Sequence, residues 1–130
     1  MKSQVFILNN ALNDLIFIGQ MTKTVTVVGK KFEIRTLTSD EQLSVTQMTK
    51  DYDPLSRVLA LKITTLSKAI VAIDDEAIVD RSKFLEQLSK IQIPVINKLY
   101  SEYDALVVEQ NDKVNDIDAI KNSSTMATQG

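Results

Sequence analysis

The sequence has 130 residues, of which 44% are hydrophobic and 25% are charged, and these values are typical of a single soluble globular domain. Its formal net charge is −2, so it lacks the basic surplus that a general nucleic-acid-binding protein carries. The sequence contains neither Cys nor His, which excludes a disulfide framework, thiolate chemistry, Ser–His catalysis and every histidine metal site.

The N-terminal segment, residues 4–18, is rich in apolar residues and has two interpretations. Helical spacing relates five of its residues, and Gly19 is well placed to end a helix: Leu8, Ala11, Leu12, Leu15 and Ile16. The segment is also compatible with two short buried strands, so the helix is preferred and the strands stay open. Its first apolar run is too short for the core of a signal peptide, so the protein is expected in the cytosol of the cell that makes it.

Residues 22–37 are predicted to form a β-hairpin. The first strand is rich in valine and threonine, and Gly29-Lys30 supplies the turn, where glycine is free to adopt a positive φ. In the second strand Phe32 and Ile34 alternate with charged residues, which indicates one buried face and one exposed face. A lone hairpin is marginal in water, so it must lie on the helices or pair with an edge of another chain.

Two helices are predicted to follow the hairpin. Thr38 and Glu41 match a capping box, which starts a short helix that ends around Lys50. Asp53 and Pro54 then start a long central helix that is predicted to run to Ile73. One face of this helix is apolar and is expected to be buried throughout its length: Leu55, Val58, Leu59, Ile63, Leu66, Ala69, Ile70 and Ile73.

A short acidic loop, Asp74 to Glu76, leads to a second long helical segment that begins near Asp80. Pro94 is expected to kink or restart this helix, which should end at about Glu109. Its apolar stripe recurs at close to 3.6 residues: Phe84, Leu88, Ile91, Val95, Leu99, Tyr103 and Leu106. The predicted fold is therefore mainly α (α+β), a small helical bundle with an N-terminal β-hairpin. Residues 1–111 form one domain, and residues 112–130 form a polar C-terminal tail.

Charge is unevenly distributed along the chain. Residues 1–35 carry five cations and two acids, whereas residues 101–130 carry two cations and six acids. A basic front and an acidic back suit head-to-tail association of identical subunits, so a homo-oligomer is left open. Two ordinary solvated surfaces explain the same distribution and are the preferred interpretation.

Carboxylates are the only remaining candidates for chemistry. Three groups of them are close enough in sequence to bind a hard cation weakly: Asp51 with Asp53, Asp74 with Asp75 and Glu76, and Asp112 with Asp116 and Asp118. None has the glycine-centred spacing of a calcium loop, so helix caps and solvated loops are the preferred interpretations. We therefore predict no catalytic residue, no cofactor, no metal site and no enzyme activity.

Three stretches resemble the tail assembly chaperones of tailed bacteriophages. They are GKKFEIRTLTSDEQ, the helix LSRVLALKITTLSKAIVAID, and FLEQLSKIQIPVINKLYSEYDAL, and the resemblance spans roughly Val25 to Leu106. It consists of packing positions and includes no active-site motif. Small baseplate and tail-completion proteins of phages have similar patterns.

The resemblance implies a non-catalytic protein that binds the tape-measure protein and brings tube subunits to it, in the host cytoplasm. The alternative is a structural component of the virion tail or baseplate that bridges neighbouring subunits. Binding would use apolar grooves between helices and an open hairpin edge. The candidate partner contacts are Phe32 and Ile34 on the hairpin and Tyr100 and Tyr103 on the last helix, with no nucleic acid or membrane involved.

Overall fold

The computed structural model describes residue 15 and residues 18–129, with side chains described as far as residue 117. Its elements, in chain order, are β1 (Thr22–Val27), β2 (Lys30–Arg35), α2 (Ser39–Thr49), α3 (Pro54–Ala69), β3 (Ile70–Ile73), β4 (Glu76–Ala77), α4 (Arg81–Leu88) and α5 (Ile93–Gln129). The mainly helical α+β class is confirmed, with a four-stranded antiparallel sheet in place of a lone hairpin. The choice between helix and strand for residues 4–18 lies almost entirely outside the described residues.

The predicted β1–β2 hairpin is confirmed, but its turn lies one residue earlier than expected. Val27 faces Lys30 across the hairpin, so Val28 and Gly29 are the two turn residues. Both have positive φ, 46° and 77°, which is the geometry that matches the twist of a two-residue hairpin. The turn therefore places a β-branched residue in the left-handed region, where such side chains are rarely found.

The prediction that the central helix reaches Ile73 is wrong, because α3 ends at Ala69 and residues 70–73 form β3. Three of the four residues in this segment are β-branched, and such residues favour strands. β3 pairs with the open edge of β2, which gives the hairpin the neighbour that it needs within its own chain. Arg81 donates hydrogen bonds to the carbonyl oxygens of Ser67 and Ile70, and so satisfies the end of α3.

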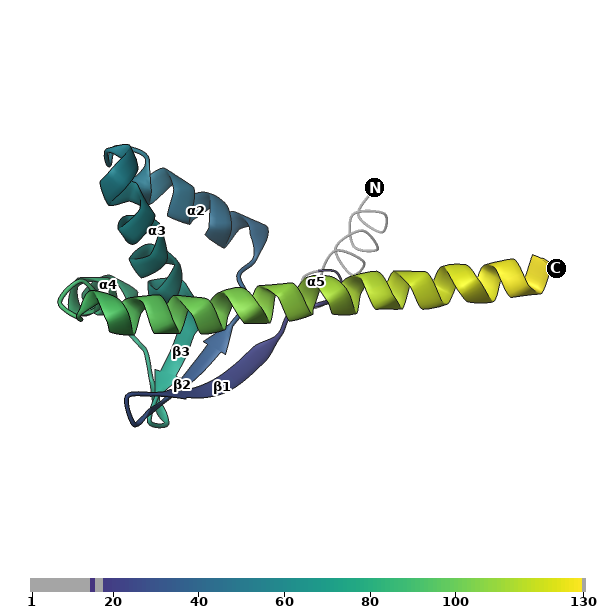
Figure 1. The fold of residues 1–130 in the computed structure, drawn as a ribbon, viewed down its shortest axis with the longest axis horizontal. Coiled ribbons are helices and arrows are strands. Elements are labelled where there is room, and N and C mark those ends of the chain that lie inside the picture. Colours follow the sequence, from purple (N-terminus) through teal and green to yellow (C-terminus); the bar gives the residue numbers. More distant parts are fainter. Residues whose placement is uncertain (1–14, 16–17, 130) are drawn as a thin grey trace, which may run out of the picture.

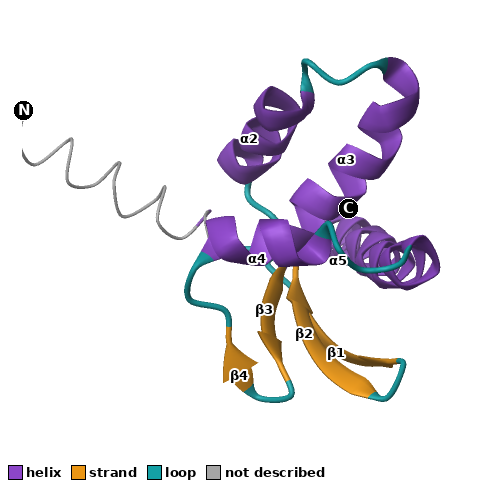
Figure 2. Cartoon of the chain, turned by 90° about the vertical axis from the view of Figure 1, so that its left-hand side faces the viewer, coloured by secondary structure: helices purple, strands orange, loops and turns teal. Residues whose placement is uncertain are grey.

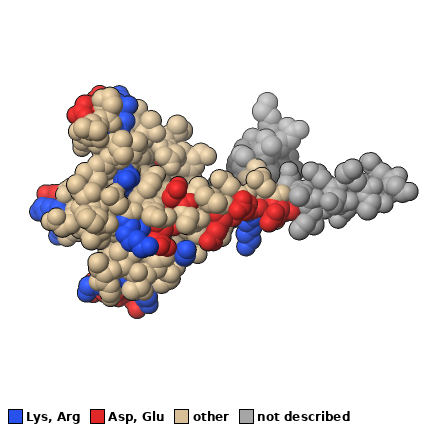
Figure 3. All heavy atoms as spheres, viewed as in Figure 1, with Lys and Arg blue, Asp and Glu red and all other residues tan. Residues whose placement is uncertain are grey.

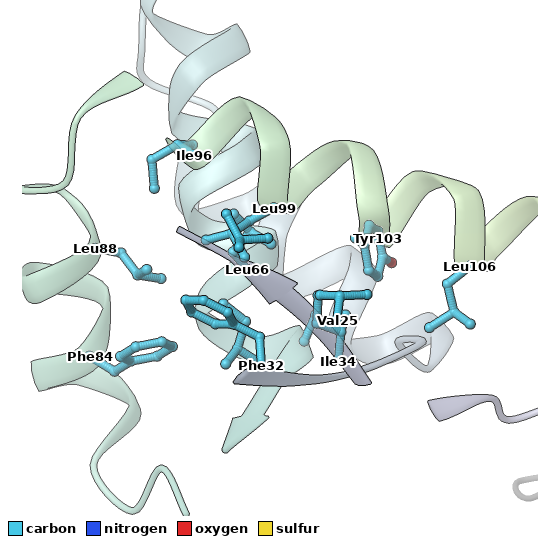
Figure 4. Packing of buried hydrophobic residues seen from close by; sticks show 13 residues of the cluster. Val25, Phe32, Ile34, Leu66, Phe84, Leu88, Ile96, Leu99, Tyr103 and Leu106 are labelled. Carbon is cyan, nitrogen blue, oxygen red and sulfur yellow. The ribbon is translucent and has the colours of Figure 1, made fainter. Parts of the chain in front are cut away.

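The core lies between one face of the sheet and the helices α3, α4 and α5 (Figures 1 and 2). Figure 4 shows the strand residues Val25, Phe32 and Ile34 directed towards side chains of the three helices. The buried cluster comprises Val25, Val27, Phe32, Ile34, Leu66, Ala69, Ile70, Phe84, Leu88, Ile96, Leu99, Tyr103 and Leu106. The opposite face of β1 carries threonines that are exposed.

Only the C-terminal half of the predicted α3 face is buried. Leu66, Ala69 and Ile70 lie in the core, whereas Leu55 is 87% exposed and Val58 is 55% exposed. The first turns of α3 lie beyond α5 and beside α2, as Figure 1 shows, and they leave Leu55 and Val58 exposed. The apolar stripe of α3 is therefore buried only where it faces the core.

The last helices begin as predicted, but α5 ends much later. Asp80 caps α4 by accepting a hydrogen bond from the backbone N–H of Lys83 at 3.1 Å, and α5 begins at Ile93 beside Pro94. The expected end at about Glu109 is wrong, because α5 continues as a helix to Gln129 and includes most of the predicted tail. No Gly or Pro occurs between Pro94 and the end of α5, so no residue there breaks the helix.

Candidate partner-binding surface

Three of the four predicted partner contacts lie in the hydrophobic core. Phe32, Ile34 and Tyr103 are buried, because β2 is a central strand and α5 lies over its inner face. Tyr100 is half-buried, and its ring centroid lies 5.8 Å from that of Tyr103 and 5.8 Å from the ammonium nitrogen of Lys62. A partner that binds the surface of this chain can therefore contact Tyr100 but not the other three residues.

Two of the carboxylates considered as weak cation ligands, Asp53 and Asp74, have structural roles. Asp53 Oδ1 accepts hydrogen bonds from the backbone N–H groups of Ser56 at 2.9 Å and Leu55 at 3.1 Å, and the bond from Ser56 is the main cause that lowers the pKa of Asp53. Asp74 accepts from the backbone N–H of Lys31 at 2.8 Å, and this bond lowers its pKa. Among the described residues, no group of three acids is placed to hold a metal ion.

A groove of about 610 Å³ lies where α5 passes the end of the sheet and the start of α2. The described residues that line this α5 groove are Leu15, Ile18, Gln20, Thr36, Leu37, Thr38, Ser39, Asp40 and Gln110. Leu15 and Ile18 are more than half exposed, so two large apolar side chains stand open at its rim. Among the described lining residues, Asp40 is the only charged one.

Gln110 links the elements that line the α5 groove through hydrogen bonds. Its side-chain amide donates hydrogen bonds to the carbonyl oxygen of Gly19 at 3.0 Å and to Thr36 Oγ1 at 3.1 Å. Thr36 Oγ1 also accepts from the backbone N–H of Met21 at 3.1 Å. A Cβ on Gly19 would lie 2.9 Å from Val114 Cγ2, so glycine allows this close approach to α5. These contacts hold the start of β1 and the end of β2 against α5.

A bidentate ion pair fixes the start of α2, which forms one wall of the groove. Arg35 donates to the two carboxylate oxygens of Glu41 at 2.9 and 2.6 Å. Glu41 Oε1 also accepts from the backbone N–H of Thr38 at 3.0 Å, which is one half of the predicted capping box. The bond from Arg35 is the main cause that lowers the pKa of Glu41 to about 2.

Beyond the groove, α5 continues the stripe that faces the core. Leu99, Tyr103 and Leu106 are buried on the sheet, and the same face then carries Gln110, Val114 and Ile117. Val114 is 41% exposed and Ile117 is 43% exposed, because the sheet no longer lies below them. We call Gln110, Val114 and Ile117 the distal stripe.

An acidic ridge flanks the distal stripe. Glu102, Glu109 and Asp116 are seven residues apart, so they lie along one side of α5. Figure 3 shows acidic side chains gathered where α5 leaves the body of the protein. Glu102 pairs with Lys23 at 3.6 Å and with Lys98 at 3.2 Å. Sequence reasoning missed this surface because it ended the helix near Glu109.

The basic front of the chain is neutralised internally. Four cations of the first 35 residues are described, and each pairs with an acid of the same chain: Lys23 with Glu102, Lys30 with Asp74, Lys31 with Asp75 and Arg35 with Glu41. The Lys31–Asp75 pair, at 2.7 Å, links the two hairpin turns. These pairs favour ordinary solvated surfaces over head-to-tail attraction between copies.

A second hollow, of about 490 Å³, lies beside the β3–β4 hairpin. It is lined by Lys30, Ile73, Asp74, Glu76, Ala77, Ile78, Phe84 and Gln87. Because its rim carries both signs of charge, it favours no class of ligand as clearly as the α5 groove does.

Within the described part of the chain, no helix is long and apolar enough to cross a membrane. Comparison with protein-family models, with curated proteins and with solved structures finds no match to this chain.

Proposed function

We propose that this protein is a non-catalytic, protein-binding factor in the assembly of bacteriophage tails, acting as a tail assembly chaperone for tape-measure and tube proteins. Two independent lines support this proposal. The first is the resemblance of Val25–Leu106 to that family. The second, which carries most weight, is the open apolar surface formed by the α5 groove and the distal stripe.

Such a surface suits a binding function because it is apolar, concave and held by specific contacts. Leu15 and Ile18 stand at the rim of the groove, and Gln110 fixes its floor through two hydrogen bonds. Apolar grooves of this kind accept the apolar face of an amphipathic helix from another protein. A chaperone for a helical partner works by covering such faces, so no bond has to be made or broken.

One observation favours the alternative, a structural component of the virion tail or baseplate. α5 has 37 residues and is about 55 Å long at the standard helical rise, and it runs well past the sheet (Figure 1). A rigid helix of this length suits a permanent bridge between neighbouring subunits. The same chain would then remain in the particle after assembly.

Mass spectrometry of purified particles and of infected-cell lysates tests both proposals. A chaperone is expected in complexes with tail proteins in the lysate and absent from purified particles. A bridging component is expected in purified particles at a copy number that matches the tail symmetry. Both proposals fail if the gene does not lie among phage tail genes, or if no tail protein co-purifies with the chain.

A further inference from the structure

We infer that the distal stripe and the α5 groove together receive a basic amphipathic helix of another protein. This inference names the chemistry of the partner and rests on the protein-binding role proposed above. It depends on the shape of the surface, on the charge beside it and on the internal pairing of this chain's own cations.

The shape favours a helix as the partner. Gln110, Val114 and Ile117 follow one another at steps of four and three residues, so they form a narrow seam along α5. The seam leads into the α5 groove at Gln110, which belongs to both surfaces. A second helix that lies along α5 would cover Val114 and Ile117 and would place its end between Leu15 and Ile18.

The charge beside the seam favours a basic partner. Residues that flank a helix–helix seam pair with the flanking residues of the opposite helix. Here the acidic ridge occupies one flank, where Lys113 is the one cation close to Glu109 and Asp116, and no ion pair among the described residues involves any of these three. Asp40 adds a third acid at the groove. Lys and Arg on the flank of the incoming helix would neutralise these charges and speed association.

The same charges disfavour a second copy of this chain as the partner that binds α5. In an antiparallel pair of α5 helices, Glu109 and Asp116 would face the same flank of the other copy, where these two acids outnumber the one nearby cation, Lys113, so net repulsion remains. In a parallel pair the ridge would face the opposite flank, which carries Tyr100 and Val107 and offers no cation. The described cations at the front of the chain are already paired internally.

Binding of designed peptides to the full chain tests the inference. The probe is a helix of about three heptads with leucine on one face and lysine on both flanks, and its matched control carries glutamate in place of lysine. Isothermal titration calorimetry at low and at physiological salt should show binding of the lysine peptide only, weakened by salt. Equal binding of both peptides, or of neither, would overturn the inference.

Variants of the chain then locate the binding surface. Glu109→Gln with Asp116→Asn removes two ridge charges and should weaken the lysine peptide about tenfold at low salt. The control, Glu86→Gln with Asp104→Asn, makes the same charge change at exposed positions away from the ridge and should change affinity less than about twofold. Equal losses in both double variants would overturn the assignment to α5.

Two further results separate this inference from its alternatives. Ile117→Asn should weaken the peptide without changing the mass of the protein in sedimentation equilibrium. A concentration-dependent dimer that Ile117→Asn abolishes would identify a second copy as the occupant and overturn the inference. If tail proteins still co-purify with the Glu109→Gln, Asp116→Asn double variant, this binding site is refuted but the proposed function is not. If no tail protein co-purifies with the wild-type chain, the proposed function itself is refuted.

Discussion

Replacing Val28 with asparagine should stabilise the protein. Val28 has a φ of 46° and is 73% exposed, so its side chain gains little from burial while its backbone sits in the left-handed region. That region costs an ordinary residue about 1–2 kcal/mol, whereas asparagine tolerates it. Val28→Asn should therefore raise the free energy of unfolding by about 1 kcal/mol, which corresponds to about 3–4 °C in Tm for a chain of this length.

The neighbouring residue supplies a control with the opposite sign. Gly29 has a φ of 77°, and a Cβ added there would meet nothing within 4 Å, so any cost of Gly29→Ala is conformational and not steric. This variant should lose about 1 kcal/mol. Urea denaturation followed by circular dichroism measures both changes. A loss of stability in Val28→Asn, together with a neutral Gly29→Ala, would show that the hairpin turn does not have this geometry.

Two further predictions concern α3 and α2. Leu66→Ala should cost about 2–5 kcal/mol in the same denaturation assay because Leu66 is fully buried, while Leu55→Ala on the exposed part of the same helix should cost less than about 0.5 kcal/mol. The lowered pKa of Glu41 implies stability that is complete above its unfolded value of 4.5 and is lost as the pH falls towards about 2. Glu41→Gln should remove about 1–2 kcal/mol at neutral pH, after allowance for solvent screening of its pair with Arg35, and should flatten the pH dependence of stability in that window.

Sequence reasoning located the elements whose ends are encoded locally. Asp53 with Pro54 starts α3, Asp80 starts α4, and Thr38 with Glu41 starts α2, because each cap acts on backbone groups within three residues. The end of α3 was missed because it is set by pairing with β2, which lies about 40 residues earlier in the chain. A run of apolar residues does not reveal such a distant neighbour.

The candidate surface was harder to predict than the fold. A regular apolar stripe shows that a face is amphipathic, but it does not show where its neighbour ends. Leu55 and Val58 therefore look like core residues in the sequence, although both are exposed. Phe32 and Ile34 show the reverse, because β3 and α5 cover strand residues that were proposed as contacts. The α5 groove joins residues as far apart as Leu15 and Gln110, which no local pattern relates.

The distal part of α5 is expected to be stabilised by the partner that it binds. Helices in proteins gain most of their stability from packing of an apolar face, and short helices without such packing are marginal in water. Residues 110–117, QNDKVNDI, include asparagine, aspartate and valine, which are weak helix formers, and the sheet does not cover them. A partner that packs on Val114 and Ile117 would supply the missing stabilisation, so binding and helix formation would reinforce each other. The acidic ridge would then select a basic helix from the other amphipathic helices in the cell, through charges that an apolar partner would leave unpaired.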